Sequence, residues 1–210
     1  MYKQLLEQYK KKKHEIQNRL QDFKKNWNKS DKEIFSELCF CICTPQSKAV
    51  YCDKAVSLLK KTGGLFDSGL KGIRKGLDKV RFPNNKARYI IEARDLFRMN
   101  GRIKIKQKIN TCDILKTREW LVEKVKGLGY KEASHFLRNI GFGENLAILD
   151  AHILRCMVRY KIIKNIPPKI SKKKYLFLEE KIKKFSNKIN IPMDELDLLF
   201  WSSETGRVFK

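Results

Sequence analysis

The fold is decided by nine residues, Val125-Lys126-Gly127-Leu128-Gly129-Tyr130-Lys131-Glu132-Ala133. They predict two helices joined by a tight turn, because glycine lacks the Cβ that opposes a positive φ. Val125 and Leu128 are expected to pack the two helices together. Amides at the start of the second helix point outward with the positive end of the helix dipole, where two glycines let an anion come close. The pattern favours a helix-hairpin-helix element that binds a nucleic-acid backbone, and a plain αα-hairpin with a glycine cap is the alternative.

The remaining sequence also predicts helices, separated by Gly, Pro or Asn. Ser30-Asp31-Lys32-Glu33 is typical of a capping box that opens a helix through Cys43. Alternating strand patterns are scarce, so the expected fold class is all-α. The other helices are expected near residues 5–23, 47–60, 86–99, 117–126, 130–139, 151–160 and 192–206.

Charge and length limit the partners of this chain. Its 210 residues are enough to bury a core, and 47 Lys and Arg against 23 Asp and Glu give a net charge of +24. Such an excess indicates a polyanionic partner, although a solvated Lys-rich surface is the alternative. No run approaches the roughly 18 apolar residues of a membrane span, and the N-terminus lacks a signal-peptide pattern. We therefore expect a cytoplasmic protein with no membrane partner.

Six cysteines are present, and they indicate buried free thiols rather than a metal site. No Cys-x-x-Cys pair occurs, and one helix cannot easily direct all three cysteines of residues 39–43 at one ion. Free buried thiols fit a reducing compartment. The six are Cys39, Cys41, Cys43, Cys52, Cys112 and Cys156.

Lys131 and Asp150 stand out as a pair of side chains suited to catalysis. Lys131 follows Gly129 by two positions, and Asp150 begins the run Asp150-Ala151-His152-Ile153-Leu154-Arg155. The electropositive field of a helix N-terminus favours the neutral form of an amine, and a neutral amine is a nucleophile. Alternatively, the lysine is a solvated charge and the aspartate is only a helix cap.

These residues match a known family. Residues 125–133, followed by Asp150-x-His152, resemble the helix-hairpin-helix DNA glycosylases that carry a catalytic lysine and a downstream aspartate. Residues 82–90 are similar to the family's Asn-Lys-Ala-Arg segment, and residues 43–47 to its Gln-containing loop. The tail, residues 202–210, resembles that of the archaeal-type 8-oxoguanine glycosylases, the second Ogg group. The likeness covers most of residues 31–210.

The resemblance implies a two-lobed helical fold with DNA in a central cleft. One lobe would combine residues 1–33 with 150–210, and the other would hold residues 34–149 with the hairpin at about 117–139. The implied activity is removal of 8-oxoguanine by base flipping, followed by a lysine Schiff base and β-elimination. The enzyme would act as a monomer on double-stranded damaged DNA, without a metal or cofactor. A glycosylase for oxidised pyrimidines and a non-catalytic DNA-binding module are the alternatives.

Site residues carry over from the family by position. Lys131 would be the nucleophile, and Asp150 would assist loss of the base. The implied base-binding residues are Trp201, Lys210 and Gln46. The implied contacts to the DNA backbone are Gly127, Leu128, Gly129, His152, Lys86 and Arg88.

Overall fold

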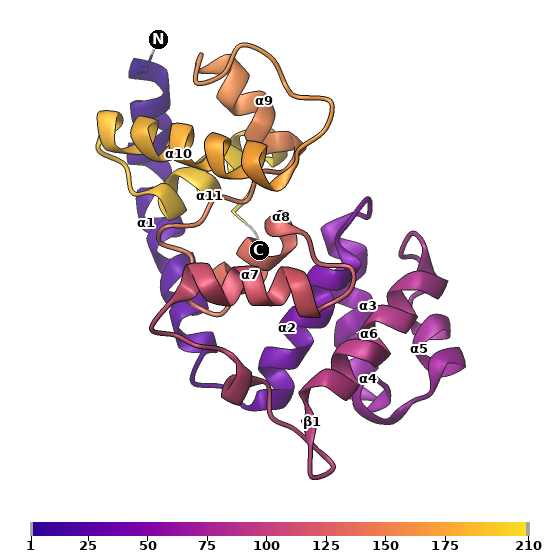
Figure 1. Ribbon diagram of the computed structural model, residues 1–210. Coiled ribbons are helices and arrows are strands. Elements are labelled where there is room, and N and C mark those ends of the chain that lie inside the picture. Colours follow the sequence, from indigo (N-terminus) through magenta and orange to yellow (C-terminus); the bar gives the residue numbers. More distant parts are fainter. Residues whose placement is uncertain (1, 209–210) are drawn as a thin grey trace. The chain divides into compact units, whose positions relative to one another are not determined.

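The computed structural model describes residues 2–208 and separates the chain into two compact units. Unit 1 combines residues 1–25 with 137–210, and unit 2 spans residues 26–136. Both units are helical, as the sequence predicts (Figure 1). The expected lobes change after residues 33 and 149, whereas these units change after residues 25 and 136. The segment of residues 137–149 groups with unit 1, where the Ala147 amide donates to Glu179 at 2.8 Å.

Unit 2 is built around α2 (Asp31–Cys43). Nine of its 13 residues are buried, and it packs against α3 and α6. Half of the expected capping box is present. Ser30 Oγ accepts the Glu33 amide at 3.4 Å, but the Glu33 carboxylate pairs with Lys60 at 2.8 Å instead of returning to the Ser30 amide. The other elements of this unit are α3 (Ala49–Lys61), α4 (Gly64–Asp67), α5 (Leu70–Gly76), α6 (Pro83–Phe97), β1 (Arg98–Met99), β2 (Arg102–Ile103), the 3-10 helix η1 (Ile105–Lys108), α7 (Ile114–Lys124) and the greater part of α8 (Tyr130–Asn139), whose residues from 137 on belong to unit 1.

A short hairpin interrupts the helices of unit 2. Strands β1 and β2 pair antiparallel on either side of Asn100 and Gly101. Both turn residues have positive φ, 49° and 73°, as a two-residue type I′ turn requires. The sequence marks this pair only as a helix break, because two strand residues on each side are too few for an alternating pattern.

Unit 1 has its core along α11 (Met193–Thr205), whose residues 193–200 are all buried. This helix contacts α9 (Ala151–Arg159) and α10 (Lys172–Ile189). The rings of Tyr160 and Phe200 stack with centroids 5.3 Å apart. The long α1 (Lys3–Asn26) joins this core through Tyr9, whose hydroxyl donates to Glu195 at 2.7 Å.

The cysteines are all free, and five of the six are buried. This confirms the predicted buried thiols except at Cys112, which is exposed because it lies in the turn before α7. Burial raises the pKa of Cys156 to about 11. Burial also raises the pKa of Cys39, Cys43 and Cys52, which disfavours the reactive thiolate form.

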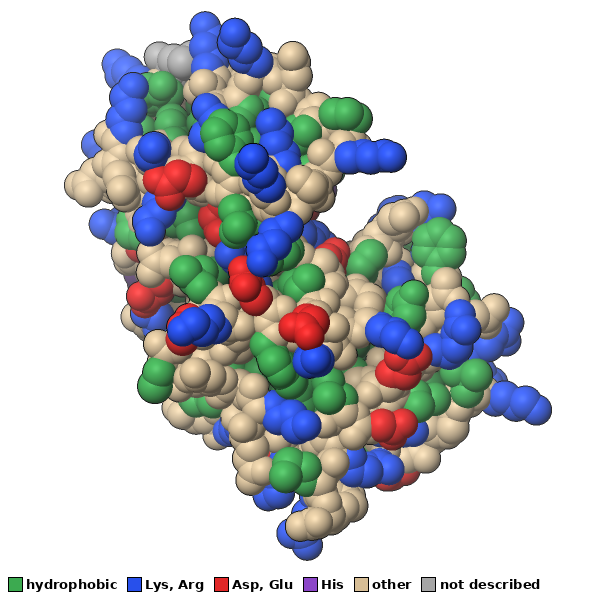
Figure 2. Space-filling view, in the orientation of Figure 1, with side chains coloured by type: hydrophobic (Ala, Val, Ile, Leu, Met, Phe, Trp, Pro, Cys, Tyr) green, Lys and Arg blue, Asp and Glu red, His purple; other side chains and the backbone are tan. Residues whose placement is uncertain are grey.

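The surface is strongly basic. In the view of Figure 2, Lys and Arg side chains are spread over both units and predominate over Asp and Glu. Among the described residues, no helix has both the length and the apolar character needed to cross a bilayer.

Candidate active site

Helices α7 and α8 form the predicted helix-hairpin-helix element, joined by residues 125–129. Val125 and Leu128 are buried in the hairpin, as expected. Gly127 has a φ of +87°, and a Cβ added there would lie 2.6 Å from the Tyr89 ring. Gly129 does not have a positive φ. The sharp turn thus needs glycine for its backbone conformation at Gly127 alone.

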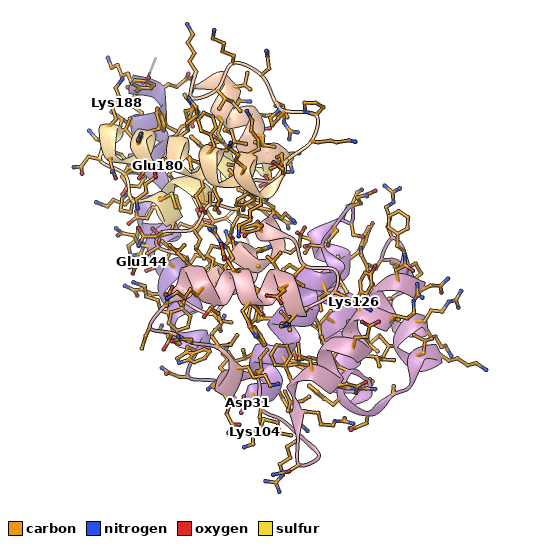
Figure 3. The ribbon with its side chains drawn as sticks, in the orientation of Figure 1. Asp31, Lys104, Lys126, Glu144, Glu180 and Lys188 are labelled. Carbon is orange, nitrogen blue, oxygen red and sulfur yellow. The ribbon has the colours of Figure 1, made fainter. Side chains whose placement is uncertain are left out.

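One side-chain contact joins the two helices of this hairpin, and another attaches the hairpin to α6. Arg118 of α7 is only 2% exposed, and its Nη1 donates to Ser134 Oγ of α8 at 3.1 Å. Lys126, which Figure 3 labels in the turn after α7, pairs with Glu92 of α6 at 3.0 Å. The two helices of the hairpin are therefore bonded to each other, and its turn is bonded to α6.

Lys131 lies in the first turn of α8, with its side chain 24% exposed. Its Nζ is 3.2 Å from Glu132 Oε1, and Glu132 Oε2 accepts the Gly129 amide at 3.2 Å. A carboxylate of the chain itself therefore occupies the electropositive start of α8. The sequence predicts that these amides are open to phosphate, whereas a phosphate here would have to compete with Glu132.

Asp150 is the N-cap of α9, as predicted. Its Oδ1 accepts the Ile153 amide at 2.9 Å. It belongs to unit 1, whereas Lys131 belongs to unit 2. Also in unit 1, buried Asp197 pairs with Arg138 at 2.7 Å. Burial raises the pKa of Asp197 to about 7, an effect that Arg138 opposes and the charge of Asp150 reinforces.

Trp201 lies at the edge of the unit 1 core. It is half-buried, whereas the residues before it in α11 are fully buried, and its ring meets that of His152 edge-on at 6.2 Å. His152 Nδ1 lies 2.8 Å from Arg155 Nη2, so this ring nitrogen contacts another side chain of the protein. The nearby Glu204 accepts hydrogen bonds from Arg155 and Arg159, which lower the pKa of its carboxyl. Lys210 lies outside the described residues.

Lys86 requires a correction. The resemblance suggests a phosphate contact, but this side chain is only 4% exposed. Its Nζ donates to Cys43 O at 2.7 Å, Pro45 O at 2.8 Å and Ser47 Oγ at 2.9 Å. These bonds use all three ammonium protons, so none remains for DNA. Burial lowers the pKa of Lys86, and the nearby charges of Arg81 and Lys131 add to this effect.

The Lys86 ammonium binds the loop of residues 43–47, and Ser47 of that loop bonds the segment that leads into α6. Gln46 is exposed with a φ of +55°. Ser47 Oγ also accepts the Arg81 amide at 3.0 Å, which connects this loop to Phe82. Phe82 has a φ of +57° and is 49% exposed. In the sequence, Phe82 falls only in the segment similar to the family's Asn-Lys-Ala-Arg motif and is given no role. The signal available was an aromatic residue directly before the proline that opens a helix.

Arg88 is exposed on α6, where its guanidinium donates to Asn85. Its position leaves a phosphate contact open, in contrast to Lys86. A helical chain with a glycine hairpin, a lysine in the next turn and a capping aspartate downstream has the features of the helix-hairpin-helix DNA glycosylases. Residues 16–191 match the family model described as 8-oxoguanine DNA glycosylase, and the chain belongs to this family.

Relatives and solved structures agree with this assignment. The chain is 45% identical over 204 residues to the 8-oxoguanine DNA glycosylase/AP lyase of Fusobacterium nucleatum, covering 96% of this chain and 94% of the relative. It matches the crystal structure of the Thermotoga maritima 8-oxoguanine DNA glycosylase with a TM-score of 0.86 and 34% identity, over 99% and 97% of the two chains. The Methanocaldococcus jannaschii enzyme in complex with a 15mer DNA containing 8-oxoguanine matches with a TM-score of 0.86 and 35% identity, over 99% and 100%.

Proposed function

We propose that this chain excises 8-oxoguanine from double-stranded DNA and then cleaves the strand at the resulting site. The observation that carries the proposal is Lys131 in the first turn after the glycine hairpin, within a chain of this family. The M. jannaschii structure with DNA containing 8-oxoguanine supports both the partner and the lesion. We further propose that the protein acts as a monomer.

The proposed reaction uses side chains alone. Lys131 Nζ bonds to C1′ of the flipped nucleotide while the glycosidic bond breaks and the base leaves with that electron pair. Asp150 stabilises positive charge on the sugar and assists proton transfer. Ring opening gives a Schiff base, which makes the 2′ proton acidic. Its removal expels the 3′ phosphate by β-elimination, and water then releases the lysine.

We propose Trp201, Lys210, Gln46 and Phe82 as the residues that recognise the bases. Trp201 would stack on the flipped purine, a contact worth roughly 1–3 kcal/mol by analogy with single-strand binding. Lys210, the C-terminal residue, would hydrogen-bond to it. Gln46 lies in the loop that Lys86 binds, and Phe82 lies directly before α6. An exposed aromatic residue such as Phe82 suits the wedge that fills a gap in a base stack.

Backbone contacts are assigned to the hairpin, Arg88 and His152. The amides of residues 127–129 would approach a phosphate as Glu132 yields its place. Because several phosphates would be neutralised, affinity should fall steeply with salt. A flat salt response would count against DNA as the partner.

Trapping with borohydride tests the proposal. The parent protein should become covalently attached to an 8-oxoguanine duplex, and Lys131→Gln should abolish trapping while duplex binding persists. Lys126→Gln is the matched control, because it removes a lysine of the same hairpin. A panel of damaged duplexes distinguishes the alternatives: trapping only on oxidised pyrimidines would change the substrate, and no trapping on any duplex would leave a binding module.

A further inference from the structure

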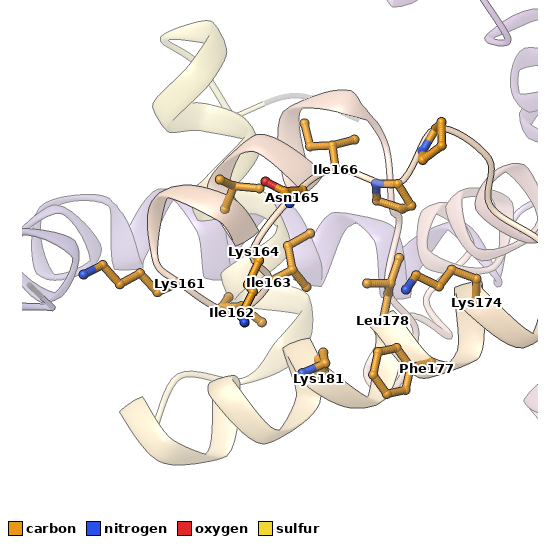
Figure 4. Close-up of a pocket in the computed structure, with 13 residues that line it drawn as sticks. Lys161, Ile162, Ile163, Lys164, Asn165, Ile166, Lys174, Phe177, Leu178 and Lys181 are labelled. Carbon is orange, nitrogen blue, oxygen red and sulfur yellow. The ribbon is translucent and has the colours of Figure 1, made fainter.

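A groove far along α9 from Asp150 has no part in the proposed reaction. It lies in unit 1 between the end of α9, the loop of residues 161–168 and α10, with a volume of about 980 Å³ (Figure 4). Asp150 caps the N-terminal end of α9, whereas the groove begins at Val158 near the other end. At 1.5 Å per residue, these ends are separated by roughly 12 Å.

The groove has an apolar floor and unusually exposed apolar walls. Ile162, Ile163 and Leu178 line it, together with Pro167 and Pro168 of the loop. Ile166 is 45% exposed and Phe177 is 52% exposed, although both are large apolar residues. Concave apolar surface of this kind is a favourable place to bury the side chains of a partner.

Lysines line the same groove, and no acidic residue does. The four are Lys161, Lys164, Lys174 and Lys181. Figure 4 shows Lys174 extending across Leu178 and Lys161 pointing away. The ammonium groups of Lys174 and Lys181 lie 5.2 and 5.1 Å from the Phe177 ring centroid, so both cluster around the exposed aromatic side chain.

The start of α10 increases this positive charge. Its first three residues, Lys172 to Lys174, are lysines, and its first turn contains no acidic residue. Cations at a helix N-terminus are unfavourable because they face the positive end of the dipole. A local arrangement that opposes stability in this way points to an anionic ligand.

We propose that this groove binds an acidic peptide segment of a partner protein, with large aliphatic side chains placed between carboxylates. The aliphatic side chains would enter the floor of the groove, and the carboxylates would meet the lysines around it. Duplex DNA is a poorer fit, because its phosphates need a basic surface but have no apolar groups to fill a concave aliphatic floor. A peptide bound here leaves the Asp150 end of α9 uncovered.

A labelled peptide tests the proposal without any DNA. The probe is the fluorescein-labelled peptide Asp-Glu-Leu-Asp-Glu-Leu-Leu-Asp-Glu, and the control peptide has serine in place of each leucine. Fluorescence anisotropy should show saturable binding of the leucine peptide and at least about tenfold weaker binding of the serine peptide, a difference of about 1.4 kcal/mol. Equal binding of the two peptides would overturn the apolar part of the proposal.

Paired variants then locate the binding. Lys174→Glu with Lys181→Glu should weaken the leucine peptide at least about tenfold, as should Ile166→Ser with Phe177→Ser. Lys10→Glu with Lys11→Glu, an equal charge change on α1, should leave it unchanged. Equal weakening by this control would show general attraction to a cationic protein and overturn the site.

Three further measurements make the outcome decisive. Each variant should retain the parental melting temperature and 8-oxoguanine excision, which separates loss of the groove from loss of the fold. A single-stranded DNA nonamer should not displace the leucine peptide. If the groove variants weaken the nonamer and not the peptide, the surface binds nucleic acid and the proposal fails.

Discussion

Replacing Lys86 with methionine should loosen the loop that carries Gln46. Lys86→Met keeps an unbranched side chain of similar length and removes three hydrogen bonds of 2.7 to 2.9 Å. Hydrogen bonds to a charged group contribute about 1.5–3 kcal/mol each, and burial of the ammonium costs several kcal/mol in return. We expect a net loss of about 3 kcal/mol, because two carbonyl oxygens also lose their donor. At about 2–4 °C per kcal/mol, the melting temperature should fall by roughly 6–12 °C.

The activity assay separates this local effect from general unfolding. Single-turnover excision of 8-oxoguanine should fall much more than cleavage of a ready-made abasic duplex, both measured well below the melting transition. Abasic cleavage needs Lys131, whereas the loop tips Gln46 and Phe82 are proposed to act on the bases. Lys86→Arg should lie between the parent and Lys86→Met, because it restores the charge with a planar geometry.

The matched control is Lys75→Met, at an exposed lysine of α5 in the same unit. It should melt and react as the parent does. A Lys86→Met protein that melts within a degree or so of the parent would refute the stabilising role of the buried ammonium. Equal losses in excision and abasic cleavage would refute the proposed link between Lys86 and base recognition by the loop that carries Gln46.

Three other substitutions test the hairpin, its counterion and the buried ion pair of unit 1. Gly127→Ala should lower the melting temperature by several degrees, since a positive φ costs about 1–2 kcal/mol and the new Cβ meets the Tyr89 ring. Gly129→Ala is the control, because its new Cβ meets only the flexible Glu132 carboxylate. Similar melting curves for the two variants would contradict this reasoning. Glu132→Gln should bind a duplex with a non-cleavable lesion roughly two- to fivefold more tightly in fluorescence anisotropy, because it removes a carboxylate from the proposed phosphate site. Weaker binding would argue for a positioning role of Glu132 instead. The raised pKa of Asp197 makes the folded state hold its proton, so the stability that this group contributes falls as pH rises from the ordinary carboxyl range of about 4 to about 7. The melting temperature of Asp197→Asn should therefore improve relative to the parent across that window, and the two curves should run parallel above it. Parallel curves throughout would show that Asp197 does not titrate there.

Local sequence was enough to predict the elements that depend on near neighbours. The second hairpin helix was predicted at 130–139 and observed at Tyr130–Asn139. Asp150 was predicted as a cap and bonds the amide three residues later. Caps and glycine turns can be recognised in this way because their hydrogen bonds and φ angles involve only a few adjacent residues.

Burial and long-range pairing were decided by the folded chain. Nothing beside Lys86 in the sequence indicates that its ammonium lies among backbone oxygens about 40 positions earlier. Likewise, Arg138 meets Asp197 across 59 positions. A solvated lysine and a buried lysine have the same local pattern, since what differs is the set of atoms that packing brings around them. Tertiary packing therefore changed the role of Lys86 from a phosphate contact to a structural one, although the sequence had identified its motif.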